Sequence, residues 1–183
     1  MKVLDLFSGL GGFSQAFKDR GHEVITVDIN PAFRPTICTD ILKMDISVLG
    51  DGYDVILAAP PCTEFSRESM PWTRTGNQPD LRLVLKTREI IDRLKPRWWI
   101  VENVRGAAPY LDKIFGNHKR VGPRYFWGDF PIFYVPHEVA YGKEKLPPSM
   151  DRVAIRSKIE YEISLSLCRA IEVWEIAEVM QHA

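Results

Sequence analysis

The stretch KVLDLFSGLGGF, residues 2–13, decides the fold class of this 183-residue chain. Residues 2–7 form an apolar run typical of a buried strand, and the glycines that follow allow a tight turn. Residues 13–20 then predict a helix that ends at Gly21, and residues 22–28 predict a second strand. Strand, helix and strand in this order form a βαβ unit, which predicts that the two strands pair in parallel.

Strand and helix patterns continue to alternate along the chain. Residues 53–59 and 97–104 are apolar runs that predict buried strands, and residues 81–94 carry apolar side chains at helical spacing. Residues 124–128 predict one more short strand. This alternation predicts an α/β fold in which helices cover both faces of a mostly parallel sheet. A closing helix that packs on the core is indicated by Ile163, Leu167, Ile171, Trp174 and Ala177.

The predicted sheet also indicates where a ligand would bind. In open α/β sheets, ligands bind beyond the carboxyl ends of the strands. We therefore expect the functional site directly after Phe7, Asp28, Ala59 and Val104.

Cysteine content and hydrophobicity restrict the class of protein. Cys38, Cys62 and Cys168 lie far apart without a Cys-x-x-Cys pair, which argues against a disulfide framework and a structural zinc site. No segment reaches the roughly 20 apolar residues that a membrane span needs. The length fits one ordinary core. We expect a single soluble, intracellular domain over residues 1–183, with no bound metal and no membrane contact.

Charge is unevenly placed along a chain whose net charge is zero. Residues 67–124 hold 13 basic and 6 acidic side chains, whereas the segments on either side are acidic. A basic segment of this kind can contact a polyanion, and it can equally be a solvated helix face. Both interpretations stay open from the charge pattern.

The glycine turn and the end of the second strand suggest an adenosine-containing ligand. Glycine lets a ligand approach the backbone closely, and Asp28 stands where a carboxylate commonly accepts hydrogen bonds from ribose hydroxyls. The dinucleotide fingerprint needs a third glycine where Ser14 stands, which disfavours nicotinamide and flavin cofactors. The alternative is a plain tight turn beside an exposed strand-end aspartate.

A cysteine and a glutamate are predicted at the same edge of the sheet. Pro60 and Pro61 stiffen the exit of one strand and place Cys62 at the ligand-binding edge, which suggests a nucleophile. Glu102 closes the next apolar strand and could act as an acid or a hydrogen-bond partner. The alternatives are a buried structural thiol for Cys62 and a helix-capping or ion-pair role for Glu102.

Three motifs together resemble the cytosine-C5 DNA methyltransferase family, in a small, phage-type form. DLFSGLGGF (residues 5–13), PPC (residues 60–62) and ENV (residues 102–104) stand in that family's order and approximate spacing. The resemblance implies a Rossmann-like S-adenosylmethionine-dependent methyltransferase fold. It also implies a cytoplasmic enzyme of a prokaryotic or phage-infected cell.

The resemblance implies roles for individual residues. Cys62 would add to carbon 6 of cytosine, Glu102 would engage ring atom N3, and Arg124 would contact the cytosine carbonyl. Carbon 5 would then take a methyl group from S-adenosylmethionine. The cofactor-binding residues implied are Asp5, Phe7, Gly9, Gly11, Gly12, Asp28 for the ribose, Asp40 for the adenine amino group, and Pro60. Because a thiol cannot reach carbon 6 inside a duplex, the DNA base must be flipped out or single-stranded.

The chain departs from the family in three places. The Gln-x-Arg-x-Arg motif is reduced to GPRY (residues 122–125), and YEIS (residues 161–164) replaces Gly-Asn-x-Val before the closing helix. Residues 129–150 predict a short loop in place of a target-recognition domain. That loop leaves room for a separate recognition subunit as partner.

Three other functions compete with DNA methylation as interpretations of these motifs. Methylation of cytosine in RNA, such as tRNA, uses much the same motifs. A non-catalytic, cofactor-binding subunit of a DNA-modifying complex would keep the fold without the chemistry. A zinc-dependent cytosine deaminase is disfavoured, because the Pro-Cys-x-x-Cys pattern fails after Cys62.

Overall fold

The computed structural model describes residues 1–69, 78–135, 155 and 157–181, with the side chains of residues 67–69 left out. Its strands are β1 (Lys2–Leu6), β2 (Glu23–Asp28), β3 (Ile37–Cys38), β4 (Val55–Ala58), β5 (Trp98–Asn103), β6 (Lys119–Val121) and β7 (Arg124–Asp129). Its α-helices are α1 (Gln15–Asp19), α2 (Thr63–Ser69), α3 (Arg82–Leu94), α4 (Ala108–Phe115) and α6 (Tyr161–Gln181). Short 3₁₀ turns η1 (Pro31–Phe33), η2 (Ile46–Leu49) and η3 (Arg105–Ala107) lie between them.

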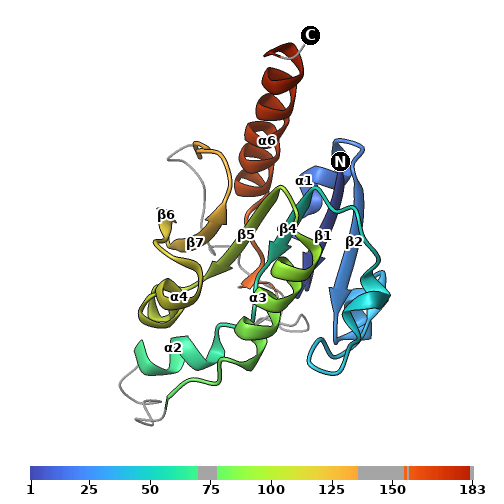
Figure 1. The fold of residues 1–183 in the computed structure, drawn as a ribbon. Coiled ribbons are helices and arrows are strands. Elements are labelled where there is room, and N and C mark those ends of the chain that lie inside the picture. The colour runs from blue at the N-terminus through green and yellow to red at the C-terminus, as the bar shows by residue number, and fades with distance from the viewer. Residues whose placement is uncertain (70–77, 136–154, 156, 182–183) are drawn as a thin grey trace.

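The seven strands form one sheet in the order β3-β2-β1-β4-β5-β7-β6 (Figure 1). The strands from β3 to β5 pair in parallel, and β7 pairs with β5 and β6 in antiparallel. The predicted βαβ unit and the mostly parallel sheet are thereby confirmed. The two-residue strand β3 and the strand β6 carry too little apolar pattern to have been predicted.

Alternate side chains of the central strands belong to two separate hydrophobic cores, one on each face of the sheet. Leu4, Leu6 and Ile56 pack with residues of α3 and α4 on one face of the sheet. Val3 and Val55 pack with residues of α1 and α6 on the other. Because successive strand residues point to opposite faces, strands buried on both faces have to be apolar at nearly every position. Helices therefore cover both faces, as predicted.

The closing helix α6 packs on the core only along its first half. Ile163, Leu167 and Ile171 are fully buried, as predicted, but Trp174 is 49% exposed, so its predicted place in the core is wrong. Trp174 makes an edge contact with the ring of Trp98, and the C-terminal end of α6 extends past the sheet (Figure 1). None of the described helices is long and apolar enough to span a bilayer.

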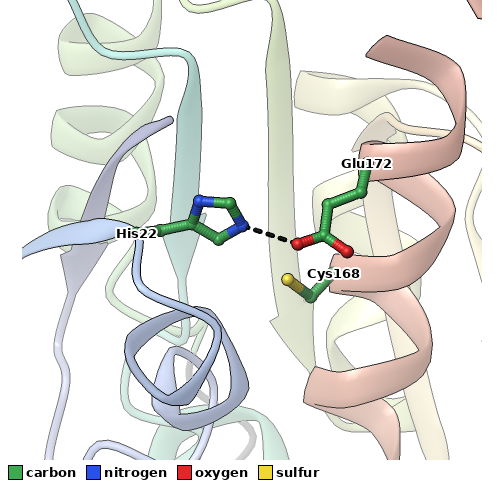
Figure 2. Close-up of side chains that lie close together, drawn as sticks. All are labelled: His22, Cys168 and Glu172. Carbon is green, nitrogen blue, oxygen red and sulfur yellow. Dashed lines mark hydrogen bonds and ion pairs between the residues drawn. The ribbon is translucent and has the colours of Figure 1, made fainter. Parts of the chain in front are cut away.

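A cluster of polar side chains fastens α6 to the turn between α1 and β2 (Figure 2). The Nε2 atom of His22 lies 2.9 Å from Oε1 of Glu172, and the Arg20 guanidinium lies 2.6 Å from Oε2. Cys168 completes a group of metal-ligating residue types. Burial raises the pKa of its thiol to about 12, and the Arg20 cation already holds the Glu172 carboxylate. The arrangement is that of an ion-pair network between two elements.

Candidate active site

A cavity of about 540 Å³ lies beyond the carboxyl ends of β1, β2, β4 and β5. Phe7, Asp28, Ala59 and Val104, the four strand exits where the site was expected, all contribute to its wall. The sequence-predicted site residues that line it are Asp5, Phe7, Gly9, Gly12, Asp28, Asp40, Pro60, Cys62, Glu102 and Arg124. Gly11 does not line it.

The glycine loop is held against the end of β2 by Asp28. The Gly9 N–H donates to Oδ2 of Asp28 at 2.8 Å, and the Asn30 N–H donates to Oδ1 at 2.9 Å. Gly11 has a φ of +74° and donates its N–H to the carbonyl of Ser8 at 2.7 Å, so its place is in the turn itself. The carboxylate of Asp28 thus lies on the cavity wall with its orientation fixed by two backbone bonds.

Gly12 makes room for another part of the chain. A Cβ atom at this position would lie 2.5 Å from the carbonyl oxygen of Ile159 and 2.6 Å from Cγ of Lys158. A hydrogen bond beside it also joins these two parts of the chain: the hydroxyl of Ser164, in the first turn of α6, donates to the carbonyl of Phe13 at 2.6 Å. The absent side chain of Gly12 therefore lets the segment before α6 close one side of the cavity, a role that the sequence reading did not assign.

Replacing Gly12 with alanine is expected to lower the free energy of unfolding by about 1–3 kcal/mol, because the backbone at Ile159 must move away. Denaturant unfolding followed by circular dichroism measures it. Gly52→Ala serves as a reference for backbone strain alone, since a Cβ there meets no atom within 4 Å but stands at a φ of +78°, whereas Gly12 has no positive φ and its loss would come from the contact. Equal stability of Gly12→Ala and wild type would contradict the close contact.

The cysteine loop is tied to the end of β5. The side-chain amide of Asn103 donates to the carbonyl of Pro60 at 2.9 Å in a buried position. The carbonyl of Cys62 accepts from the N–H groups of Phe65 at 3.0 Å and Ser66 at 2.8 Å, so Cys62 stands at the amino end of α2. The thiol is partly exposed on the cavity wall.

Glu102, Arg124 and Glu160 form a buried ionic group. Nη1 of Arg124 lies 3.0 Å from Oε1 of Glu102, and Nε lies 2.6 Å from Oε2 of Glu160. Their side chains are 8%, 11% and 12% exposed respectively. Burial raises the pKa of Glu102 above its ordinary value, although Arg124 opposes this, and Glu160 adds to it. Burial thus favours the protonated form of the Glu102 carboxyl.

Asp5 is a fully buried carboxyl at the cavity. The Ser14 hydroxyl donates to its Oδ2 at 2.5 Å, while its Oδ1 has no hydrogen-bond partner among the described residues. Burial raises its pKa to about 7, and the hydrogen bond from Ser14 only partly opposes this. Ser14 therefore has a structural use at the position where the dinucleotide fingerprint has glycine.

The raised pKa of Asp5 predicts a stability that falls as pH rises from about 4 to about 7. In that range the folded chain retains a proton that the unfolded chain has released, so stability present at low pH is lost, by up to about 4 kcal/mol. Asp5→Asn should remove this loss, as measured by urea unfolding at about pH 5 and about pH 8, with Asp51→Asn as exposed control. The same pH slope in Asp5→Asn and wild type would contradict the assignment.

Sequence reasoning missed several residues of the cavity wall. They are Ile29, Phe33, Ile41, Leu42, Leu83, Ser157 and Ile159. Most are apolar and come from loops between predicted elements, where periodicity carries no signal. Ile159 and Glu160 lie immediately before YEIS (residues 161–164), where the family resemblance weakens, and that departure was the available signal.

Comparison with known proteins decides the family. The model of the C-5 cytosine-specific DNA methylase family matches residues 1–110. The chain belongs to this family. The match ends at residue 110, so it takes in the glycine loop, Cys62 and Glu102 of the cavity but not Arg124 or the closing helix.

Curated members of the family resemble the chain at moderate identity. Type II methyltransferase M.HgiGI of Herpetosiphon aurantiacus is 30% identical over 129 residues, which are 62% of this chain and 97% of that protein. M1.HphI of Haemophilus parahaemolyticus is 28% identical over 120 residues, which are 57% of this chain and 32% of that protein. The chain spans only about a third of the length of M1.HphI, and 38% of M.AplI of Arthrospira platensis.

Solved structures of methyltransferases share the fold. A protein described as a DNA modification methyltransferase of an E. coli prophage superposes with a TM-score of 0.50 at 22% identity, over 70% of this chain and 46% of that one. Entamoeba histolytica methyltransferase EhMeth gives 0.52 at 17% identity, over 70% and 52% of the two chains. The fold is therefore that of a Rossmann-like methyltransferase.

Proposed function

We propose that the chain transfers a methyl group from S-adenosylmethionine to carbon 5 of cytosine in DNA. One observation carries the proposal: a thiol, Cys62, and a carboxyl with a raised pKa, Glu102, line the same cavity as the glycine loop and Asp28. A nucleophile, an acid and a nucleoside-binding loop are the parts that this reaction needs. Membership of the family adds support from outside the geometry.

The cavity residues fit S-adenosylmethionine. Asp28 would accept hydrogen bonds from the ribose hydroxyls, because its carboxylate is held in place and retains free lone pairs. The apolar side chains of Phe33 and Ile41 would enclose the adenine ring, with Asp40 near its amino group. A volume of about 540 Å³ is of the size that small-molecule sites have. The bound cofactor supplies an electrophilic methyl group.

Each step then follows from this chain's own residues. The thiolate of Cys62 forms a bond to carbon 6 of cytosine while protonated Glu102 donates to N3, so the electron pair of the 5,6 double bond makes carbon 5 nucleophilic. Arg124 would bind the cytosine carbonyl. After carbon 5 has gained the methyl group it loses its proton to a base, the double bond re-forms, the Cys62 sulfur leaves as the thiolate, and N3 returns its proton to Glu102.

DNA is the substrate proposed, because the family model and the curated relatives are those of DNA methylases. The cytosine would enter single-stranded or flipped from the duplex, at a cost of a few kcal/mol that phosphate contacts from the basic segment 67–124 could offset.

We also propose one catalytic domain with a short loop over residues 129–150. Of that loop, residues 130–135 are described without helix or strand, and residues 136–150 lie outside the described residues. A separate recognition subunit and a cytoplasmic location stay predictions.

The test is transfer of labelled methyl from S-adenosylmethionine to unmethylated duplex DNA, with single-stranded DNA and tRNA in parallel. Label recovered as 5-methylcytosine in DNA is the expected result. Label in tRNA alone would replace DNA by RNA as substrate. Binding of the cofactor without label in any nucleic acid would instead indicate the non-catalytic subunit.

A further inference from the structure

The guanidinium of Arg124 is held almost completely by this chain. Nε and Nη2 both donate to Glu160, at 2.6 and 3.2 Å. Nη2 also donates to the carbonyl of Lys158 at 2.5 Å, and Nη1 donates to Glu102 at 3.0 Å. A guanidinium has five N–H groups, so within the described residues one N–H of Nη1 is left for a ligand in the cavity. Glu160 thus determines which edge of Arg124 faces Glu102.

Charge balance within this buried group is as important as its geometry. One positive charge lies between two carboxylates, and in a weakly solvated position a cation favours the ionised form of any carboxyl beside it. With Arg124 alone, Glu102 would be stabilised as the carboxylate. A second carboxylate on the opposite edge of the guanidinium offsets that effect. Glu102 would have to carry a proton to donate to N3 of cytosine, so this offset bears on the proposed reaction.

We propose that Glu160 is a positioning residue of the active site: it orients Arg124 and offsets its charge, so that Glu102 carries the proton required at the cytosine ring. This inference rests on the proposed function for its consequence, and on the contacts of Arg124 for its geometry. Glu160 comes from the segment before α6, 58 residues after Glu102 in the sequence. The family match does not extend to it.

Other charged or titratable groups near Glu102 do not have the same contact. Asp5, Asp28, Asp40 and Cys62 line the cavity with it, and Lys158 presents its carbonyl to Arg124. The groups that act on the pKa of Glu102 are Arg124, which lowers it, and Glu160, which raises it, beside the larger effect of burial. Removing the charge of Glu160 should therefore let Glu102 ionise at lower pH.

The test compares Glu160→Gln with wild type in the methyl-transfer assay across pH. Glutamine keeps the shape and loses the charge. We expect the basic limb of the kcat profile to move to lower pH, with kcat at about pH 8 reduced roughly tenfold and the KM for S-adenosylmethionine unchanged. Glu162→Gln, an equal charge change two positions away on the exposed side of α6, should match wild type. Glu160→Asp, which retains the charge, should keep the basic limb in place.

A second readout does not depend on activity. Carbon-13 labelling of glutamate carboxyls allows the titration of Glu102 to be followed by NMR, with its signal identified by its loss in Glu102→Gln. The signal should titrate at lower pH in Glu160→Gln than in wild type. An unchanged titration and an unchanged profile, or a loss of kcat that is equal at every pH, would overturn the inference. An inactive wild type with a shifted titration would refute the proposed reaction and leave the role of Glu160 standing.

Discussion

Replacing Cys62 with alanine is expected to abolish methyl transfer to cytosine, by roughly 10⁴-fold or more, while cofactor binding stays as in wild type. Without the thiol, nothing adds to carbon 6, and carbon 5 remains a poor nucleophile. The loop that carries Cys62 should keep its shape, because its hydrogen bonds with the N–H groups of Phe65 and Ser66 involve the backbone carbonyl of residue 62 and not the thiol. The glycine loop and Asp28, which would bind the cofactor, are held by other contacts.

Two measurements separate these effects. Incorporation of labelled methyl into DNA reports the reaction, and calorimetric titration with S-adenosylmethionine reports cofactor binding. Cys38→Ala is the matched control, because Cys38 is an exposed cysteine outside the cavity wall. A Cys62→Ala protein with near-normal turnover would exclude the covalent mechanism, whatever its affinity for the cofactor.

Replacing Glu102 with glutamine should lower kcat by roughly 10²–10⁴-fold, the contribution usual for a positioned acid. Glutamine has nearly the same shape and can still accept from Arg124, but it cannot transfer a proton to N3. The KM for S-adenosylmethionine should change little, since Glu102 acts on the base. Steady-state kinetics on duplex DNA measures both constants.

Glu23→Gln, at the exposed first residue of β2, serves as the control for this substitution. If Glu102→Gln kept a kcat within a few-fold of wild type, the raised pKa of Glu102 would reflect burial alone and proton donation would have to be assigned elsewhere.

The sheet and the location of the cavity were predictable, because each depends on patterns local in sequence. Apolar runs such as those of β4 and β5 mark strands buried on both faces, and their carboxyl ends define a ligand edge. Cys62 follows β4 and Glu102 lies near the carboxyl end of the adjacent strand β5, so their common place on the cavity wall could be expected. The hydrogen bond from the Asn103 amide to the Pro60 carbonyl holds the PPC and ENV motifs together.

What the sequence did not reveal depends on contacts between distant segments. Periodicity marked Trp174 as a core residue, but whether a helix face is covered depends on where the sheet ends. Glu160 was missed because nothing in its neighbours in sequence indicates Arg124 as its partner. For Gly12, the nearest obstacle to a side chain is Ile159, 147 residues later in the sequence. The apolar pattern of a single strand or helix cannot predict contacts of this kind.

The closure of the cavity by the segment before α6 has a consequence for biosynthesis. Ser164 bonds to Phe13, a partner 151 residues earlier in the chain. Chains are made from the amino terminus at roughly 5–20 residues per second, so the glycine loop leaves the ribosome many seconds before the residues that close it. During that interval the half-built sheet exposes the apolar face that α6 later covers, Gly12 lacks its contact with Ile159, and Arg124 lacks its bonds to Glu160. Translation of residues 157–171 should thus be the step that lets the nascent chain complete its fold. A pause before this segment would prolong the period in which the exposed apolar face can lead to aggregation.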